Sequence, residues 1–531
     1  MVLGEIEGRL DTIERQGVVR RSAASGDFEF RHVLMRDALY DGILSSRRAE
    51  LHLRVANAIE RRGSANVAEF VETLAYHFSL STKHDKAFSY CLLAGRKCLD
   101  IYSLEEAERY FRKALSLIEM VPKCADDQGL ATAVANLLEV LYLRGDLLGL
   151  QVAADRYIPR LQALGDTPQL VFALYFHCML LQHHCDFAAA EERAMLALAT
   201  AQRLSDVRAQ AYAQSALMFS SIILGRHTLE AAEAEGQRML ETCIKSGDNY
   251  ILNWAYWMIA WDYVSRGLTG KARVWALKLI ESGKQREDNR AIGMAYWTLA
   301  WIDIQDNLFA DAIANAKRCM MTAATPFDRN AGTMVSATGL LLQGRIEEGL
   351  AQLLSLKKWA LANGWRYSAS GVDFAAGPAL AATGRIGEGV RMLEEGIAAS
   401  EANGCRAMAT WNRMALANLY VRMLASKERP SLKFALSNSG ALLRVLTRGN
   451  REAQRLLAEA IANDQIHELS ISRGRIEIDL ARLSLLRKRT DLARQHLKKA
   501  RLAAAAQESS FMLGEIESIE ASFPAASQRS A

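Results

Sequence analysis

The sequence has very little proline and no long apolar run. Only 7 of its 531 residues are proline, which disrupts helix interiors, so the count suits an almost wholly helical chain. No uninterrupted apolar run reaches the roughly 18 residues of a membrane-spanning helix. Residues 1–14 mix charged and apolar side chains, unlike a signal peptide. We therefore expect a cytoplasmic protein that does not bind membranes.

The chain also lacks a strong excess of one charge and any tight cysteine spacing. A formal net charge of +5 is small for this length, and basic residues are interspersed with acidic ones. This distribution argues against nucleic acid as a partner. The 8 cysteines show no pairing pattern and indicate buried thiols in a reducing compartment.

No catalytic motif is apparent. The segment 384–389 is glycine-rich but follows a helical pattern, so it predicts a turn and not a dinucleotide-binding loop. One cluster of metal-ligand residue types lacks the tighter spacing typical of zinc sites, and we interpret it as core or cap packing: His177, Cys178, His183, His184 and Cys185. We expect no catalytic residue, cofactor or metal ion.

Turn residues recur with a period of about 40 residues, which is typical of helical repeats. One series of breaks falls at Gly145, Cys185, Gly225, Gly267, Asn307, Gly344 and Gly384. A second, interleaved series falls at Gly165, Ser205, Gly247, Glu287, Pro326, Gly364 and Gly404. Apolar residues at three- and four-residue spacing fill the segments between the breaks, which predicts one helix per segment.

A single hairpin of two such helices cannot bury its own apolar faces, so neighbouring hairpins must stack. The sequence therefore predicts an all-α fold: a right-handed superhelical solenoid of tetratricopeptide-like hairpins. After Gly404 the period slips by roughly one irregular helix and a loop, and Gly449 is the next expected break. Ser103 and Glu106 also have the spacing of a helix capping box.

Tryptophan is concentrated in two adjacent repeats. Residues on a concave solenoid face would anchor a peptide or protein partner, because tryptophan is enriched at binding hot spots. The alternative is packing between repeats in the core. The candidate partner-binding residues are Trp254, Trp257, Trp261, Trp297 and Trp301.

The N-terminal region has a different pattern. Residues 3–14 predict an amphipathic helix, residues 17–21 and 28–30 predict short strands, and Ser25-Gly26-Asp27 predicts the turn between them. A helix followed by a two-stranded hairpin is the second half of a winged helix. An irregular cap on the solenoid is an equally good interpretation.

A motif follows that resembles the segment after the ATPase module in large signalling ATPases of the STAND type. Its residues include Phe28, Phe30, His32, Asp37, Ala38, Tyr40, Arg47, Arg48, Leu51 and His52. In that family a P-loop ATPase precedes a winged helix and a tetratricopeptide-like array, and some members carry a cyclase or a LuxR-type domain. The resemblance implies that this chain is the C-terminal part of such a protein, without its catalytic domains. For His32 and His52 we expect buried, hydrogen-bonded packing.

The predicted organisation has five parts. They are a winged-helix remnant with a junction helix (1–62), helical repeats (63–404), an irregular insertion (405–448), terminal repeats (449–520) and a flexible tail (521–531). The predicted function is a non-catalytic interaction or sensor module that binds a protein or peptide, including a separate ATPase or cyclase half. The alternative is a regulatory subunit that binds a small-molecule inducer. A peptide binder should show an open aromatic groove, and an inducer binder an enclosed pocket with converging polar groups.

Overall fold

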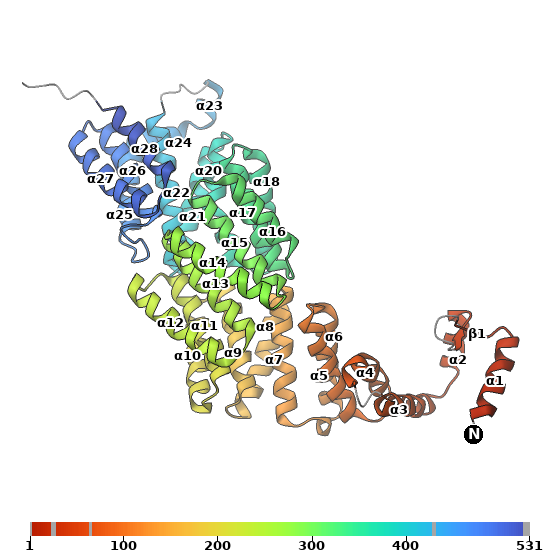
Figure 1. The fold of residues 1–531 in the computed structure, drawn as a ribbon. Coiled ribbons are helices and arrows are strands. Elements are labelled where there is room, and N and C mark those ends of the chain that lie inside the picture. Colours follow the sequence, from red (N-terminus) through yellow and green to blue (C-terminus); the bar gives the residue numbers. More distant parts are fainter. Residues whose placement is uncertain (1–2, 23–27, 63–65, 427–431, 524–531) are drawn as a thin grey trace, which may run out of the picture. The chain divides into compact units, whose positions relative to one another are not determined.

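The computed structural model describes residues 3–22, 28–62, 66–426 and 432–523 (Figure 1). The chain divides into two compact units, Met1–Asn136 and Leu137–Ala531. The expected turn at Ser25-Gly26-Asp27 lies outside the described residues, as does most of the predicted tail. Among the described residues, no helix is both long and apolar enough to cross a membrane.

The first unit starts with helix α1 and a two-stranded antiparallel sheet in which Val19 pairs with Phe30. A helical region follows. The elements are α1 (Leu3–Arg15), β1 (Val19–Arg21), β2 (Phe28–Phe30), α2 (Val33–Asp41), α3 (Ser45–Arg62), η1 (Val67–Glu69), α4 (Val71–Ser79), α5 (His84–Asp100), α6 (Leu104–Met120) and η2 (Pro122–Cys124). Helix α7 (Asp127–Arg144) continues into the second unit.

Helices α5 and α6 form a close hairpin, because a glycine on one helix faces an aromatic ring on the other. A Cβ at Gly95 would lie 2.5 Å from the ring of Phe111. The predicted capping box at the start of α6 is wrong in part. Ser103 does occupy the N-cap position, but its side chain makes no capping hydrogen bond. Glu106 instead pairs with Arg109, one turn along the same exposed helix face.

The second unit is a series of helices, most of which pack on the next helix along the chain. The helices are α8 (Leu147–Ala163), α9 (Pro168–His183), α10 (Phe187–Leu204), α11 (Val207–Leu224), α12 (Leu229–Ser246), α13 (Asn249–Arg266), α14 (Thr269–Gln285), α15 (Asn289–Gln305), α16 (Phe309–Met321), α17 (Pro326–Leu342), α18 (Ile346–Ala362), α19 (Arg366–Ser370), α20 (Asp373–Ala382), α21 (Ile386–Ala402) and α22 (Arg406–Ala425). Helices α9, α11, α13 and α15 are buried on nearly all sides, whereas α12 and α14 bury one stripe. The predicted all-α solenoid of tetratricopeptide-like hairpins is confirmed.

The helices end where the sequence predicts, because most breaks place a residue in the left-handed backbone region. Gly225 has φ 61° and Ser205 has φ 54°. At several breaks the next residue is an aspartate that caps the following helix. The side chain of Asp248, for example, accepts hydrogen bonds from the backbone N–H groups of Tyr250 and Ile251. The exception is the break before α17, where Thr325 and Asp328 form a complete capping box.

After α22 the chain forms two short helices and a π-helical turn, and four longer helices follow. The first three elements are α23 (Leu432–Ser437), α24 (Ser439–Arg444) and the π-helical turn (Val445–Gly449). The longer helices are α25 (Asn450–Ile461), α26 (Ile471–Leu486), α27 (Thr490–Ala506) and α28 (Ser510–Ala521). The expected break at Gly449 is wrong, because Gly449 has φ −54° and joins the π-helical turn to α25. The chain turns instead between α25 and α26.

Later helices of the second unit return to the ends of earlier ones, so the solenoid completes a superhelical turn. We call the line of contact the seam. At the seam, donors from residues 365–475 reach backbone carbonyls at or just past the C-terminal ends of helices α7, α11, α13 and α15. The pairs are Trp365 Nε1 to Gly145 O (3.1 Å), Gln465 Nε2 to Ile222 O (2.7 Å), Ile471 N to Gly267 O (3.0 Å) and Arg475 Nη2 to Gln305 O (2.8 Å). Such helix-end carbonyls have no partner within their own helix.

Candidate functional site

The tryptophans of α13 and α15 line a small aromatic cavity inside the second unit. The 40-residue period places Trp257 beside Trp297, with ring centroids 5.5 Å apart, and Trp261 stacks on Trp297 at 4.6 Å. Trp301 follows one turn further along α15. These four residues surround a cavity of about 80 Å³ with an almost wholly apolar lining.

Aromatic residues from later in the chain close the cavity on its other side. Trp411 of α22 meets Trp261 edge to face, with ring centroids 6.4 Å apart. Trp365, at the start of α19, also lines the cavity. The cavity is therefore an interior feature of the superhelix and is built from two of its turns.

Several indole N–H groups around the cavity lack an acceptor. Among the described residues, no hydrogen-bond partner is found for Nε1 of Trp257, Trp297 and Trp301, all three of which are buried atoms. An unsatisfied buried donor typically costs about 1–3 kcal/mol. Trp365 differs, since its N–H donates to Gly145 O at the seam. These N–H groups are enclosed by protein atoms, and the surface that faces the cavity is almost wholly apolar.

His183 contributes a neutral imidazole to the same wall. Its ring centroid lies 4.3 Å from that of Trp365, and its Nε2 lies 3.5 Å from the Tyr142 hydroxyl. Burial, with a smaller contribution from His184, lowers the pKa of His183 to about 3. An imidazole with so low a pKa stays uncharged at neutral pH, so the cavity wall carries no positive charge from His183.

A much larger chamber, of about 1480 Å³, adjoins the aromatic cavity. Trp261, Trp301 and Trp411 line both spaces. Most other lining residues are apolar, and they come from α13, α15 and α17 on one side and α20, α22 and α26 on the other. The volume exceeds the ~300–1,000 Å³ of ordinary small-molecule pockets, so a ligand and water would fit together.

The polar residues of the chamber gather on α26 and its neighbours. Arg482 Nη2 donates to Glu515 at 2.8 Å, and Asn418 Nδ2 donates to Asp479 at 2.9 Å. Burial raises the pKa of Asp479, an effect that Asn418 and Arg482 partly offset. Arg475 lies one helical turn before Asp479 on the same lining face. The polar groups of the chamber are therefore concentrated on α22, α26 and α28, whereas its aromatic residues come mainly from α13, α15, α20 and α22.

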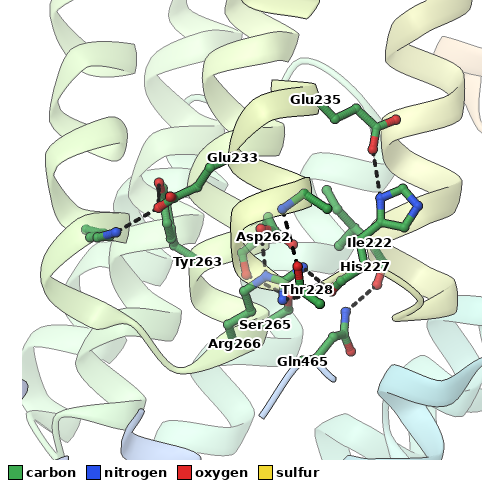
Figure 2. Close-up of polar contacts among 12 residues, drawn as sticks. Ile222, His227, Thr228, Glu233, Glu235, Asp262, Tyr263, Ser265, Arg266 and Gln465 are labelled. Carbon is green, nitrogen blue, oxygen red and sulfur yellow. Dashed lines mark hydrogen bonds and ion pairs between the residues drawn. The ribbon is translucent and has the colours of Figure 1, made fainter. Parts of the chain in front are cut away.

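A second polar cluster, at the turn between α11 and α12, has a structural role (Figure 2). Arg266 donates to Asp262 at 2.8 Å and, with two other nitrogens, to the backbone oxygen of His227 at 3.1 Å. Gln465 donates to Ile222 O beside this turn. Arg266 therefore joins α13 to the loop between α11 and α12. Gln465 joins the end of α11, beside that loop, to the following turn of the superhelix.

In the first unit, the motif that resembles the segment after the ATPase module of STAND-type proteins has His52 at its centre. The Tyr40 hydroxyl lies 2.8 Å from His52 Nε2, and His52 Nδ1 lies 2.8 Å from His77 Nδ1. Burial lowers the pKa of both histidines. Arg48 lies over the Tyr40 ring at 5.0 Å.

The other motif residues are exposed or half-buried. Phe30 is 41% exposed, Asp37 pairs with the adjacent Arg36, and Arg47 pairs with Glu50. The expectation of a buried His32 is wrong. His32 is exposed at the N-cap of α2, which contains no buried residue, so there is no core for it to enter.

Three of the five histidines and cysteines of residues 177–185 are buried, namely His177, Cys178 and His183, whereas His184 and Cys185 are half-buried. Cys178 and His183 are fully enclosed, and burial lowers the pKa of His177 to about 4. Among the described residues, no group of three or more histidine, cysteine, aspartate or glutamate side chains has the arrangement of a metal site.

Four of the five sequence-selected tryptophans lie around the cavity. Trp254, the fifth, is 2% exposed and packs on Trp257 from behind, at 4.6 Å between ring centroids. The sequence did not identify the residues that complete the site, because they lie far along the chain: Trp359, Trp365, Trp411 and Arg475. Their spacing carries no repeat signal that could have indicated a shared site.

Comparisons with known proteins give likenesses of fold only. No family model matches the chain, and no curated protein matches it. One solved structure is a Rap protein complexed with competence and sporulation factor, at 13% identity and TM-score 0.37, covering 80% of this chain and 99% of that one. Another is Scc4 in complex with Scc2n, at 10% identity and TM-score 0.44, covering 92% and 93%.

A third likeness is a signal transduction ATPase with numerous domains and a tetratricopeptide repeat sensor, from Pyrococcus horikoshii. Its identity is 13%, its TM-score is 0.33, and the match covers 78% of this chain and 54% of that one. At such identities and TM-scores these likenesses carry no argument about function.

Proposed function

We propose that the chain is a non-catalytic sensor module of helical repeats, in which residues 137–531 bind an effector between two turns of the superhelix. The observation that carries this proposal is the chamber of about 1480 Å³, which both turns line and which adjoins the aromatic cavity. The chamber is partly open to solvent and combines apolar and aromatic residues with a few polar groups, a combination that suits an effector-binding module. Trp261, Trp301 and Trp411 line it.

Binding of an uncharged fluorescent amine, N-phenylnaphthylamine, tests the proposal. The probe should bind the wild-type chain, and Trp301→Ala should weaken binding about tenfold or more, since a buried tryptophan anchor is typically worth ~2 kcal/mol. Trp275→Ala is the matched control, because Trp275 packs on Tyr256 and Lys278 and does not line either space.

A second substitution keeps the test valid if Trp301→Ala fails to fold. Ala415 lines the chamber, so Ala415→Phe should reduce its volume and weaken binding while all the tryptophans remain. Absence of saturable binding to the wild-type chain, or equal affinities in all variants, would exclude the chamber as the binding site.

A protein partner is a second candidate, and the short helices of the insertion favour it. Four leucines there are more than 60% exposed: Leu432, Leu436, Leu443 and Leu446. Exposed apolar clusters of this kind mark interaction surfaces. A separate ATPase or cyclase half is the partner that the resemblance implies.

We also propose that the chain is the C-terminal part of a STAND-type signalling protein. The motif residues Tyr40, Arg48 and His52 support this proposal, since they pack on one another in the first unit. The DNA sequence upstream of the Met1 codon tests it. A P-loop ATPase in the same or the adjacent reading frame would support this origin, and an unrelated neighbouring gene would contradict it.

A further inference from the structure

Arg475 is a partly buried arginine of the second unit, and no carboxylate among the described residues pairs with it. Four other buried or partly buried arginines each pair with a carboxylate: Arg266 with Asp262, Arg290 with Asp328, Arg413 with Glu401 and Glu459, and Arg473 with Glu477. Among the described residues, Arg475 donates only to the Gln305 carbonyl, at 2.8 Å, and to Asn307 Oδ1, at 3.4 Å.

The carboxylates that face Arg475 are bound to other groups. Glu515 pairs with Arg482 at 2.8 Å, Asp306 pairs with Arg273 at 3.1 Å, and Asp479 accepts from Asn418. They attract the guanidinium only from beyond ion-pair distance, and burial lowers the pKa of Arg475 despite that attraction. An enclosed charge without a direct counterion is unfavourable, so an arriving anion would gain from pairing with it.

The guanidinium and the aromatic wall belong to one space. Arg475 lines the chamber together with Trp261, Trp301 and Trp411. A guanidinium presents a planar fork that matches a carboxylate. Stacked indoles present a flat apolar surface that fits an aromatic ring or an alkyl chain. The ligand that suits both walls is amphipathic.

We propose that the chamber binds a small organic carboxylate, with its carboxylate on Arg475 and its aromatic or aliphatic body against the indoles of Trp261, Trp301 and Trp411. The charged residues that line the chamber are three arginines and two carboxylates, so its lining carries one net positive charge: Arg422, Arg475, Arg482, Asp479 and Glu515. That charge matches one negative charge, which favours a carboxylate over a doubly charged phosphate. This inference rests on the proposed function and adds the chemical class of the effector.

Two ligands that differ only in the anionic group test the inference. Phenylbutyrate and phenylbutanol share a body, and each is titrated against N-phenylnaphthylamine bound to the full chain. Phenylbutyrate should displace the probe at a concentration about tenfold lower than phenylbutanol. Arg475→Gln should abolish this preference, which is a ratio between two ligands measured on the same variant. Arg475→Lys, which keeps the charge, should retain part of the preference.

The control is Arg494→Gln, since Arg494 is exposed on α27 and pairs with Asp491. It should leave the preference unchanged. Equal displacement by the two ligands, or a preference that survives Arg475→Gln, would overturn the carboxylate assignment and leave the proposed function intact. Failure of the uncharged probe to bind the wild-type chain would overturn both.

Discussion

At the scale of single residues, the ion pair between Arg266 and Asp262 shows how the second unit accommodates an enclosed charge. Both side chains are at most 5% exposed, and Arg266 also donates to the backbone oxygen of His227 (Figure 2). Burial raises the pKa of Asp262, and the charge of Arg266 opposes that effect. The pair is therefore sensitive to the loss of either partner and tolerant of the loss of both.

Arg266→Met should lower the stability of the chain by about 3–5 kcal/mol, because it leaves the Asp262 carboxylate buried and unpaired. Combining it with Asp262→Leu should restore most of that stability. The measurement is the midpoint of urea unfolding followed by circular dichroism. Arg494→Met is the control, since its exposed pair with Asp491 should contribute less than about 1 kcal/mol. A double variant no more stable than the single one would contradict this account.

At the scale of helices and turns, glycines with a left-handed backbone end helices, and some of them also allow another segment to pack closely. Gly247 has φ 67° and open space where a Cβ would lie. Gly267 has φ 73°, and a Cβ there would lie 3.0 Å from Ser472 Oγ and 3.1 Å from the Ser472 backbone nitrogen. The first glycine ends a helix, whereas the second also admits the next superhelical turn.

Gly267→Ala should therefore destabilise the chain more than Gly247→Ala. Both variants bear the cost of a left-handed alanine, about 1 kcal/mol, but only Gly267→Ala also forces α26 away from the end of α13. The two midpoints of thermal unfolding provide the comparison. Equal losses would show that the contact between turns adds nothing to the local backbone strain.

The helix boundaries were predictable from the sequence because their causes are local. A left-handed residue followed by a capping aspartate, as at Gly247 and Asp248, ends one helix and starts the next within two positions. Gly449 misled the prediction, because a glycine inside a helix costs only about 1 kcal/mol and packing can offset it. Part of the aromatic cavity was predictable in the same way, because Trp257 and Trp297 differ by one repeat.

At the scale of the whole second unit, the superhelical pitch decides which distant residues meet. Trp365 reaches Gly145 across 220 residues, and Gln465 reaches Ile222 across 243. No periodicity in the sequence encodes that pitch, since it arises from small rotations added over many hairpins. For this reason the sequence predicted the solenoid but not the chamber, Trp411 or Arg475.

Gln465→Ala should speed amide hydrogen exchange in residues 222–228, more than 200 positions away. Losing the bond to Ile222 O removes about 1 kcal/mol of local stability, which corresponds to about fivefold faster exchange. Gln507→Ala is the matched control, because Gln507 bonds Leu469 O at 2.9 Å without joining the two superhelical turns. Unchanged exchange in residues 222–228 would show that the seam does not stabilise this turn.

The seam also bears on how this chain can evolve. Its donors Trp365, Gln465, Ile471 and Arg475 meet carbonyls at four helix ends that follow the repeat period. An open array can gain or lose a hairpin with little effect on the others. Here, deleting one helical hairpin of about 40 residues between the acceptor carbonyls and their donors would place every later donor opposite the wrong helix end. The number of repeats is thus fixed by geometry, and variation among descendants should be confined to loop lengths and side chains.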